Sequence, residues 1–401
     1  MLYNLVVEFQ DKLDSIPLLR WIVGIMWQVE FRAFAAVLLS FALALWQGPG
    51  VIAWLQRRKI GDTAEFGHEE INRLMQGRSG VPTMGGIFLC GSILVTTALL
   101  ADVWFNRYIQ IALIVLVWMS GVGAIDDWLK LTSSQRKPGS RDGLYSWEKL
   151  VFQVGLGLVV GYFVYTAAKL PDAHALNLPL QRTYPPTAVK DFVGLRLDLA
   201  PGVIVLGVGA FAVLCAFFMT GFSNAVNITD GMDGLAGGNM VITSFALMVL
   251  AYVSGHANTA YFLLVPYVPG SAELMVLAGA MAGATLGFLW FNAHPARVFM
   301  GDTGSLALGA LMGYIGVVTR NEFLLPVIGA VYVIEISTVM MQVSWFKWTK
   351  RRYGEGRRIF PSTPIHHGFH MMGWKETQIV TRAYIVSAVA VVIALITLKI
   401  R

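Results

Sequence analysis

Acidic and amide side chains gather in a few short polar stretches of an otherwise apolar chain. Asp126 and Asp127 are adjacent, and Asn227, Asp230 and Asp233 follow one another at intervals of three residues. In a helix that interval brings side chains roughly onto one face, whereas adjacent carboxylates repel each other unless a cation offsets their charge. The first group therefore indicates a divalent cation or a reacting phosphate, and the second a base, ribose or phosphate. A solvated helix end and a tight turn are the simpler alternatives.

Two further polar stretches carry groups that bind metal or phosphate. Asp302 lies in residues 301–305, directly before an apolar segment, and Asn292 stands in the loop that precedes it. Asp302 either caps the following helix, whose N terminus attracts phosphate, or binds Mg²⁺, which accepts one or two carboxylates together with phosphate oxygens. His366 and His367 stand in the last polar loop, where an imidazole is a base when neutral and binds phosphate when protonated.

One acid, Glu335, lies in the middle of an apolar stretch, and Gln342 follows two helical turns later. An ionisable group inside a membrane span is rare and costly, so it indicates a functional role by default. A structural hydrogen bond to a neighbouring helix is an equal alternative for Glu335.

The composition is that of a polytopic membrane protein. Of the 401 residues, 56% are hydrophobic and 13% are charged, about half the charged fraction of a soluble domain. The net charge of +6 is then better explained by topology and contact with anionic membrane lipid than by binding to nucleic acid.

The apolar stretches predict an all-α fold that forms one membrane domain over residues 1–401. A spanning helix needs about 20 mostly apolar residues. Ten stretches meet this need: 30–54, 82–101, 108–125, 148–168, 201–222, 235–254, 272–291, 304–319, 325–346 and 378–398.

These ten spans place all the polar stretches on one side of the membrane. The loops on that side carry 17 Lys and Arg residues, and the loops and termini on the other side carry 10. Because Lys and Arg are enriched in cytoplasmic loops, we expect the polar stretches at the cytoplasmic face and both termini in the periplasm.

Three glycines stand four residues apart in one expected span, at Gly279, Gly283 and Gly287. Small residues at this interval let two helices approach closely in a membrane. We therefore expect this span to pack tightly against a neighbouring helix.

Five motifs, in this order along the chain, resemble those of the phospho-N-acetylmuramoyl-pentapeptide transferases, which belong to the polyprenyl-phosphate N-acetylhexosamine-1-phosphate transferases. They are residues 82–86, 123–130, 227–235, 299–305 and 364–367. The resemblance implies ten transmembrane helices, dependence on Mg²⁺, a homodimer and a place in the bacterial cytoplasmic membrane. It also implies that undecaprenyl phosphate attacks the β-phosphate of UDP-N-acetylmuramoyl-pentapeptide, so that UMP leaves and lipid I forms for peptidoglycan synthesis.

The resemblance also assigns roles to residues. It ties Asp302 to the metal and makes Asp126 and Asp127 the catalytic pair, with both as further candidate metal ligands, and it adds His366 and His367 as catalytic residues. The residues expected to bind substrates are Arg78, Thr83, Lys130, Asn227, Asp230, Gly231, Met232, Asp233, Asn292, Phe299, Ser305 and Gln342. Direct attack and a covalent aspartyl intermediate are both compatible with this set.

The sequence departs from the family's pattern at two places. Arg78 stands where the family has Lys, and Gly368 where it has a third histidine, with His370 two residues further on. At Arg78 the positive charge is kept, but a forked guanidinium does not replace the compact ammonium group of a lysine freely. At Gly368 no side chain is present to take the role of the third histidine.

Two other functions fit part of the pattern. A sibling transferase that moves N-acetylglucosamine-1-phosphate to a polyprenyl phosphate would share the aspartate motifs, but residues 82–86 and 364–367 favour the sugar-pentapeptide branch. An ion-coupled transporter would also gather intramembrane acids, yet such proteins often contain internal repeats, and the sequence shows none.

Overall fold

The computed structural model describes the chain except residues 14–16, 59–79, 133–142, 186–196 and 399–401. The described part is helical, with no β-strand beyond one isolated bridge between Ala175 and Val205. Its helices are α1 (Leu2–Glu8), α2 (Gln10–Leu13), α3 (Pro17–Met26), α4 (Val29–Arg57), α6 (Gly86–Leu100), α7 (Arg107–Leu131), α8 (Ser146–Ala167), η3 (Pro171–His174), α10 (Val208–Thr229), α11 (Leu235–Gly255), α12 (Ala257–Leu263), η4 (Ser271–Glu273), α13 (Leu274–Asn292), α14 (Gly301–Val318), α15 (Leu325–Ile328), α16 (Ala330–Tyr353), α17 (Ile365–Met371) and α18 (Glu376–Thr397). The all-α prediction is therefore confirmed.

Seven helices of the described part are long and apolar enough to cross a membrane: α4, α7, α8, α10, α11, η4 continued by α13, and α18. The apolar helix α6 is shorter, and α14 and α16 are not among the seven. These helices identify a multi-pass membrane protein, while the number of ten spans stays a prediction. Three of the ten expected spans thus correspond to α6, α14 and α16, which length and apolarity alone do not identify as membrane-spanning helices.

Several helix boundaries differ from the expected ones. The span expected at 201–222 begins at Val208, because the residues before it are extended and Val205 pairs with Ala175. The stretch expected at 325–346 is divided at Gly329 into α15 and α16. Helix α7 continues to Leu131 and therefore carries the aspartate pair within its last turns rather than beyond its end.

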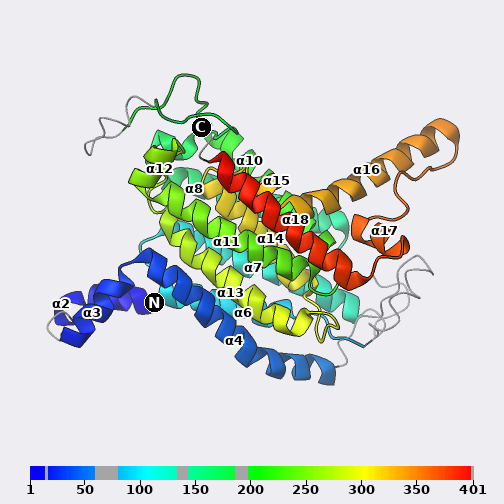
Figure 1. The fold of residues 1–401 in the computed structure, drawn as a ribbon, viewed down its shortest axis with the longest axis horizontal. Helices are drawn as coiled ribbons and strands as arrows, with labels where there is room; N and C mark the ends of the chain where they lie inside the picture. Colours follow the sequence, from blue (N-terminus) through cyan, green and yellow to red (C-terminus); the bar gives the residue numbers. More distant parts are fainter. Residues whose placement is uncertain (14–16, 59–79, 133–142, 186–196, 399–401) are drawn as a thin grey trace.

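Helix α14 lies in the middle of the bundle (Figure 1). Every residue from Asp302 to Val318 is buried, and the helix packs against α7 on one side and α10 on another. Because neighbouring helices surround it, α14 needs no lipid-facing apolar surface. Its polar first turn is thereby held at a fixed place between α7 and α10.

The three glycines of α13 pack against α4, as the sequence predicts. A methyl group on Gly279 would overlap the backbone of Ala33, and one on Gly283 would overlap the backbone of Val37. The two helices run side by side in Figure 1. This contact fixes α13, whose end leads into the loop before α14.

The polar stretches gather at one end of the bundle. Figure 1 shows α17, the start of α18 and the last turns of α4 at this end, whereas α1, α12 and the end of α18 lie at the other. Both terminal helices therefore begin or end away from the polar stretches, as expected. Which end faces the cytoplasm stays a prediction.

Candidate functional site

Two aspartates and two lysines from three helices meet at the start of α14. The ammonium nitrogen of Lys149 lies 2.6 Å from Asp126 Oδ2 and 2.7 Å from Asp302 Oδ2. The ammonium of Lys130 lies 2.7 Å from the same oxygen of Asp126 and 3.3 Å from that of Asp302. We call these four residues the acid–lysine cluster. The structure thus brings together three of the predicted site residues, Asp126, Lys130 and Asp302.

The cluster is closed on its acidic side and open on its basic side. The Asp126 side chain is fully buried, whereas that of Lys130 is 47% exposed. Two carboxylates and two ammonium groups balance one another in charge, which lowers the cost of burying the acids. Lys130 is therefore the member of the cluster that is most accessible from outside.

Sequence reasoning missed Lys149. It stands in the first turn of α8, where the sequence shows a single lysine beside an apolar span. Lysines at span ends are ordinary, because their ammonium groups extend to the membrane interface. Only the packing of α8 against α7 and α10 reveals that this lysine points inward.

Asp127 holds the first turn of α14 in place. Its Oδ1 accepts a hydrogen bond from the backbone N–H of Asp302 at 3.0 Å, and its Oδ2 accepts bonds from the N–H and the hydroxyl of Thr303 at 2.9 and 2.7 Å. Gly123, one turn earlier in α7, lies so close that an added methyl group would overlap the Asp302 backbone. Both contacts make α7 the support on which Asp302 is positioned.

Asn227 positions the Asp302 side chain from the other side. Its amide nitrogen donates to Asp302 Oδ1 at 2.7 Å and to Ser305 Oγ at 2.9 Å, and the Ser305 hydroxyl donates to the carbonyl of Gly301 at 2.9 Å. The side chain of Asn227 reaches this place because α10 continues to Thr229. The predicted residues Asn227, Asp302 and Ser305 therefore lie in one connected group.

The donor set of the cluster fits a hard cation such as Mg²⁺. Oδ2 of Asp126 and Oδ2 of Asp302 converge on one ammonium nitrogen, that of Lys149, and carboxylate oxygens are the protein ligands that Mg²⁺ prefers. The oxygens of Asp127 are engaged by the N terminus of α14. Asp302 and Asp126 are therefore better placed for a metal than Asp127, whose role as a ligand stays a prediction.

A second group of predicted residues frames the loop between α13 and α14. Asn292, which is buried, accepts a hydrogen bond from Gly234 N–H at 3.0 Å and donates one to the carbonyl of Val298 at 2.8 Å. The backbone N–H of Phe299 donates to the carbonyl of Pro82 at 2.8 Å, which places Phe299 beside the segment that contains Thr83. Arg78 lies outside the described residues.

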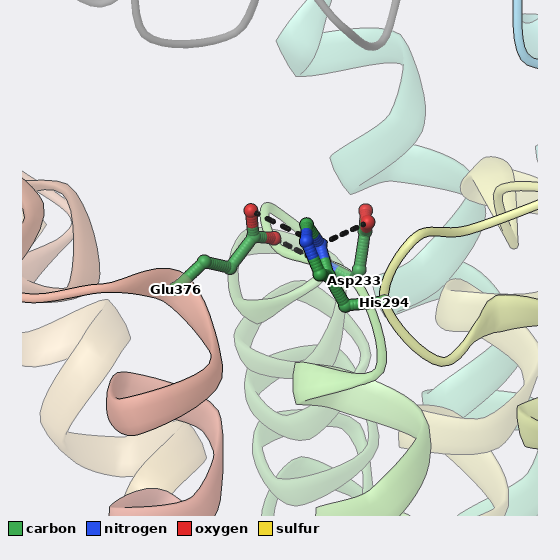
Figure 2. Close-up of side chains that lie close together, drawn as sticks. All are labelled: Asp233, His294 and Glu376. Atoms are coloured by element: carbon green, nitrogen blue, oxygen red, sulfur yellow. Dashed lines mark hydrogen bonds and ion pairs between the residues drawn. The ribbon is translucent and has the colours of Figure 1, made fainter.

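Asp233 belongs to a separate cluster with His294 and Glu376 (Figure 2). His294 Nδ1 lies 3.0 Å from Asp233 Oδ2 and 3.7 Å from Glu376 Oε2. The Asp233 oxygen also accepts the N–H of Ala296, and the Asp233 N–H donates to Glu376 Oε1 at 2.8 Å. One ligand atom from each of the three side chains lies within 4.8 Å of the others, as a metal ion would require.

His294 and Glu376 were not predicted as site residues. They come from the loop after α13 and from the first residue of α18, and nothing in their spacing along the chain connects them to Asp233. The cluster thus connects three segments at the end of the bundle where the polar stretches lie. Next to it, Met232 packs with Ile379 and Val380 of α18. Met232 therefore faces an apolar cluster, and its contact with a substrate stays a prediction.

Of the three histidines of α17, His366 and His367 are buried. His366 Nδ1 lies 3.0 Å from Oε2 of Glu335, the acid in the middle of an expected span. Gln342, on the same helix as Glu335, accepts hydrogen bonds from the backbone N–H groups of Ile359 and Phe360 and thus holds the loop that leads to α17. These contacts of His366 and Gln342 are all with residues outside the acid–lysine cluster.

An apolar cavity of about 450 Å³ lies between α16, α17 and α18. Most of its lining is aliphatic or aromatic, and its charged members are Glu335 and Arg382. The guanidinium of Arg382 lies 4.0 Å above the ring of Trp374. The cavity therefore has an apolar interior, and the exposed guanidinium of Arg382 lies over the ring of Trp374 at its lining.

Residues 108–320 match the family model of glycosyl transferase family 4. The matched stretch is slightly more than half of the 401 residues. It runs from the beginning of α7 to just beyond α14, so it contains the whole acid–lysine cluster. Glu335, the paired histidines and the apolar cavity fall after it.

Proposed function

Because the chain belongs to glycosyl transferase family 4, we propose that it transfers phospho-N-acetylmuramoyl-pentapeptide from its UDP donor to undecaprenyl phosphate. UMP and lipid I are then the products. Membership of the family supports a phospho-sugar transferase that acts on a polyprenyl phosphate. The sugar-pentapeptide is the finer part of the proposal and rests on the motifs at residues 82–86 and 364–367.

The observation that carries the proposal is the acid–lysine cluster. The donor diphosphate and the lipid phosphate are both anions, and phosphoryl transfer depends mainly on positioning and on neutralising this charge. Lys130 and Lys149 bring two positive charges to one place, next to two carboxylates that can hold a divalent cation. An arrangement of this kind suits two phosphate-bearing substrates that must meet.

Mg²⁺ fits between Asp302 and Asp126, and when bound it would neutralise charge on the diphosphate. Asn227 orients Asp302 through its amide. Lys130, which is half exposed, would bind phosphate oxygens at the entrance. Asp126 would orient the lipid phosphate, one oxygen of which forms a bond to the donor's β-phosphorus as the bond to UMP breaks.

The donor's uridine is assigned to the segment that follows α10. This segment contains Asp230 and Gly231, and its Gly234 N–H donates a hydrogen bond to Asn292. Together with Phe299, these residues would offer carboxylate, backbone, amide and ring surfaces. The segment begins three residues after Asn227, which itself touches Asp302. A nucleotide bound here would therefore extend its phosphates toward the acid–lysine cluster.

The acceptor's isoprenoid chain is assigned to the apolar cavity between α16, α17 and α18. Its lining is almost entirely apolar, and Arg382 on Trp374 supplies a cation for an anionic headgroup. The homodimer, the bacterial cytoplasmic membrane and the cytoplasmic position of the polar end are proposed together with this function.

The test is an assay of UMP release by purified protein in detergent with Mg²⁺ and undecaprenyl phosphate. UDP-N-acetylmuramoyl-pentapeptide and UDP-N-acetylglucosamine are compared as donors. Release with the first donor alone is the expected result. Release only with UDP-N-acetylglucosamine would assign the chain to the sibling reaction, and no release with either donor would overturn the proposal.

A further inference from the structure

Glu335 and His366 form a buried acid–imidazole pair that lies outside the acid–lysine cluster. Their side chains are 5% and 1% exposed, and Oε2 and Nδ1 are 3.0 Å apart. Glu335 comes from α16 and His366 from α17, so the pair joins two helices. Because an isolated polar group is costly to bury, each side chain is the other's natural partner at this depth.

The polar atoms of the pair have few other partners. Oε2 of Glu335 and both ring nitrogens of His366 make no aligned hydrogen bond with the described residues. Buried polar groups are hydrogen-bonded in the large majority of cases, and an exception calls for an explanation. The short distance between the two groups makes electrostatic attraction the interaction that fixes the ring.

The other side of the imidazole faces the segment that we assign to uridine. A methyl group built on Gly231 would lie 2.5 Å from His366 Nε2 and 3.0 Å from Cε1. Glycine is therefore the residue that lets this segment approach the ring so closely. A change in the position of the imidazole would therefore change the space that Gly231 and its neighbours can occupy.

Glu335 also lines the apolar cavity that we assign to the isoprenoid chain. One carboxylate thus borders the acceptor's cavity and contacts the imidazole that supports the donor's segment. Besides Glu335, His367 of α17 lies beside the ring, with its ring centroid 4.3 Å away, and Arg382 of α18 lines the same cavity as Glu335.

We propose that Glu335 is a positioning residue, which fixes the orientation of the His366 ring and through that ring the donor segment at Gly231. The inference rests on the proposed function, because its readout is transfer from the UDP donor. His366 acts from behind the segment and does not touch the reacting atoms. Glu335 accordingly changes donor use without belonging to the acid–lysine cluster.

The test compares Glu335→Gln with wild type, with kcat and KM measured separately for the UDP donor. Gln keeps the shape of the side chain but not its charge, so the imidazole loses the attraction that fixes its orientation. Because the ring supports the donor segment without touching the reacting atoms, we expect KM for the UDP donor to rise about tenfold, while kcat stays within about twofold of wild type.

Glu322→Gln is the matched control. Glu322 is also a buried acid, and it lies 3.2 Å from Arg320 in the link between α14 and α15, at the other end of the bundle. Burial raises the pKa of Glu322, and Arg320 opposes this shift. The control should lose stability and keep the wild-type KM for the UDP donor, whereas Glu335→Asp, which retains the charge, should recover most of the donor affinity that Glu335→Gln loses.

Each outcome decides the matter. A donor KM that rises in Glu335→Gln alone supports the positioning role. An unchanged KM, or an equal rise in both Gln variants, overturns it and leaves the proposed function in place, because wild type still releases UMP. If Glu335→Gln fails to fold, His366→Gln takes its place: a raised donor KM supports the role, and a KM equal to that of wild type overturns it. Wild type without UMP release would overturn the proposed function itself.

Discussion

Asp127 binds Thr303 through two hydrogen bonds to a single carboxylate oxygen, one from the backbone N–H at 2.9 Å and one from the hydroxyl at 2.7 Å. The relationship joins α7 to the first turn of α14. It makes Asp127 a support for its neighbour Asp302, whose N–H binds the other oxygen. The adjacent aspartates of α7 therefore differ in task, since Asp126 faces the lysines.

Replacement of Asp127 should affect stability and activity together. Asp127→Asn turns one acceptor oxygen into a donor that faces N–H groups, and a buried unsatisfied group costs about 1–3 kcal/mol. Thr303→Val removes only the hydroxyl and should cost about 1 kcal/mol. Thermal unfolding in detergent measures both. Equal stability of wild type and Asp127→Asn would contradict the supporting role.

Loss of Lys149 should reduce turnover and also lower stability, because the buried Asp126 and Asp302 then share a single ammonium group. Lys149→Met keeps much of the side-chain length but removes the charge that lies between Asp126 and Asp302. Removal of one preorganised electrostatic group typically lowers kcat by about 10²–10³-fold. The control is Lys169→Met, near the other end of α8, where the lysine is exposed. Steady-state UMP release should fall in the first variant and stay at the wild-type level in the second.

A methyl group on Gly123 should displace the start of α14. Gly123→Ala overlaps the backbone of Asp302, whereas Gly121→Ala, half a turn away on the same helix, meets no atom within 4 Å. Overpacking costs about 1–3 kcal/mol, and a shift of Asp302 also misplaces the cluster. We expect Gly123→Ala to lower both the unfolding temperature and kcat. Comparable values for the two alanine variants would show that α7 tolerates the added volume.

Removal of divalent cations should stop transfer reversibly. A chelator should abolish UMP release, and added Mg²⁺ should restore it in wild type. Asp302→Asn should remain inactive at every Mg²⁺ concentration while its unfolding temperature stays close to that of wild type. UMP release by Asp302→Asn at a near-normal rate would refute the assignment of the metal to this carboxylate.

The sequence predicts the parts of this arrangement that follow from local patterns. Apolar stretches indicate the helices, and the interval of Gly279 and Gly283 indicates their close contact with another helix. The count of membrane spans places Asp126 and Asp302 on the same side of the membrane, and hence at the same end of the bundle. These inferences need only the spacing of residues, the composition of each stretch and the order of the stretches along the chain.

Other parts depend on packing that no local pattern records. Lys149 has the appearance of an interfacial lysine, and only the position of α8 turns it toward the acids. His294 and Glu376 meet Asp233 from segments far apart in the chain. The start of α10 at Val208 also follows from a distant partner, because Val205 pairs with Ala175.

The position of Lys149 between Asp126 and Asp302 has a thermodynamic consequence. A divalent cation that enters this place competes with an ammonium group instead of replacing water, so its affinity for the free protein is reduced. An anionic diphosphate gives the lysines new partners and thereby releases the carboxylates. Metal and nucleotide binding are then linked with positive cooperativity, which Mg²⁺ titrations with and without the nucleotide donor would measure.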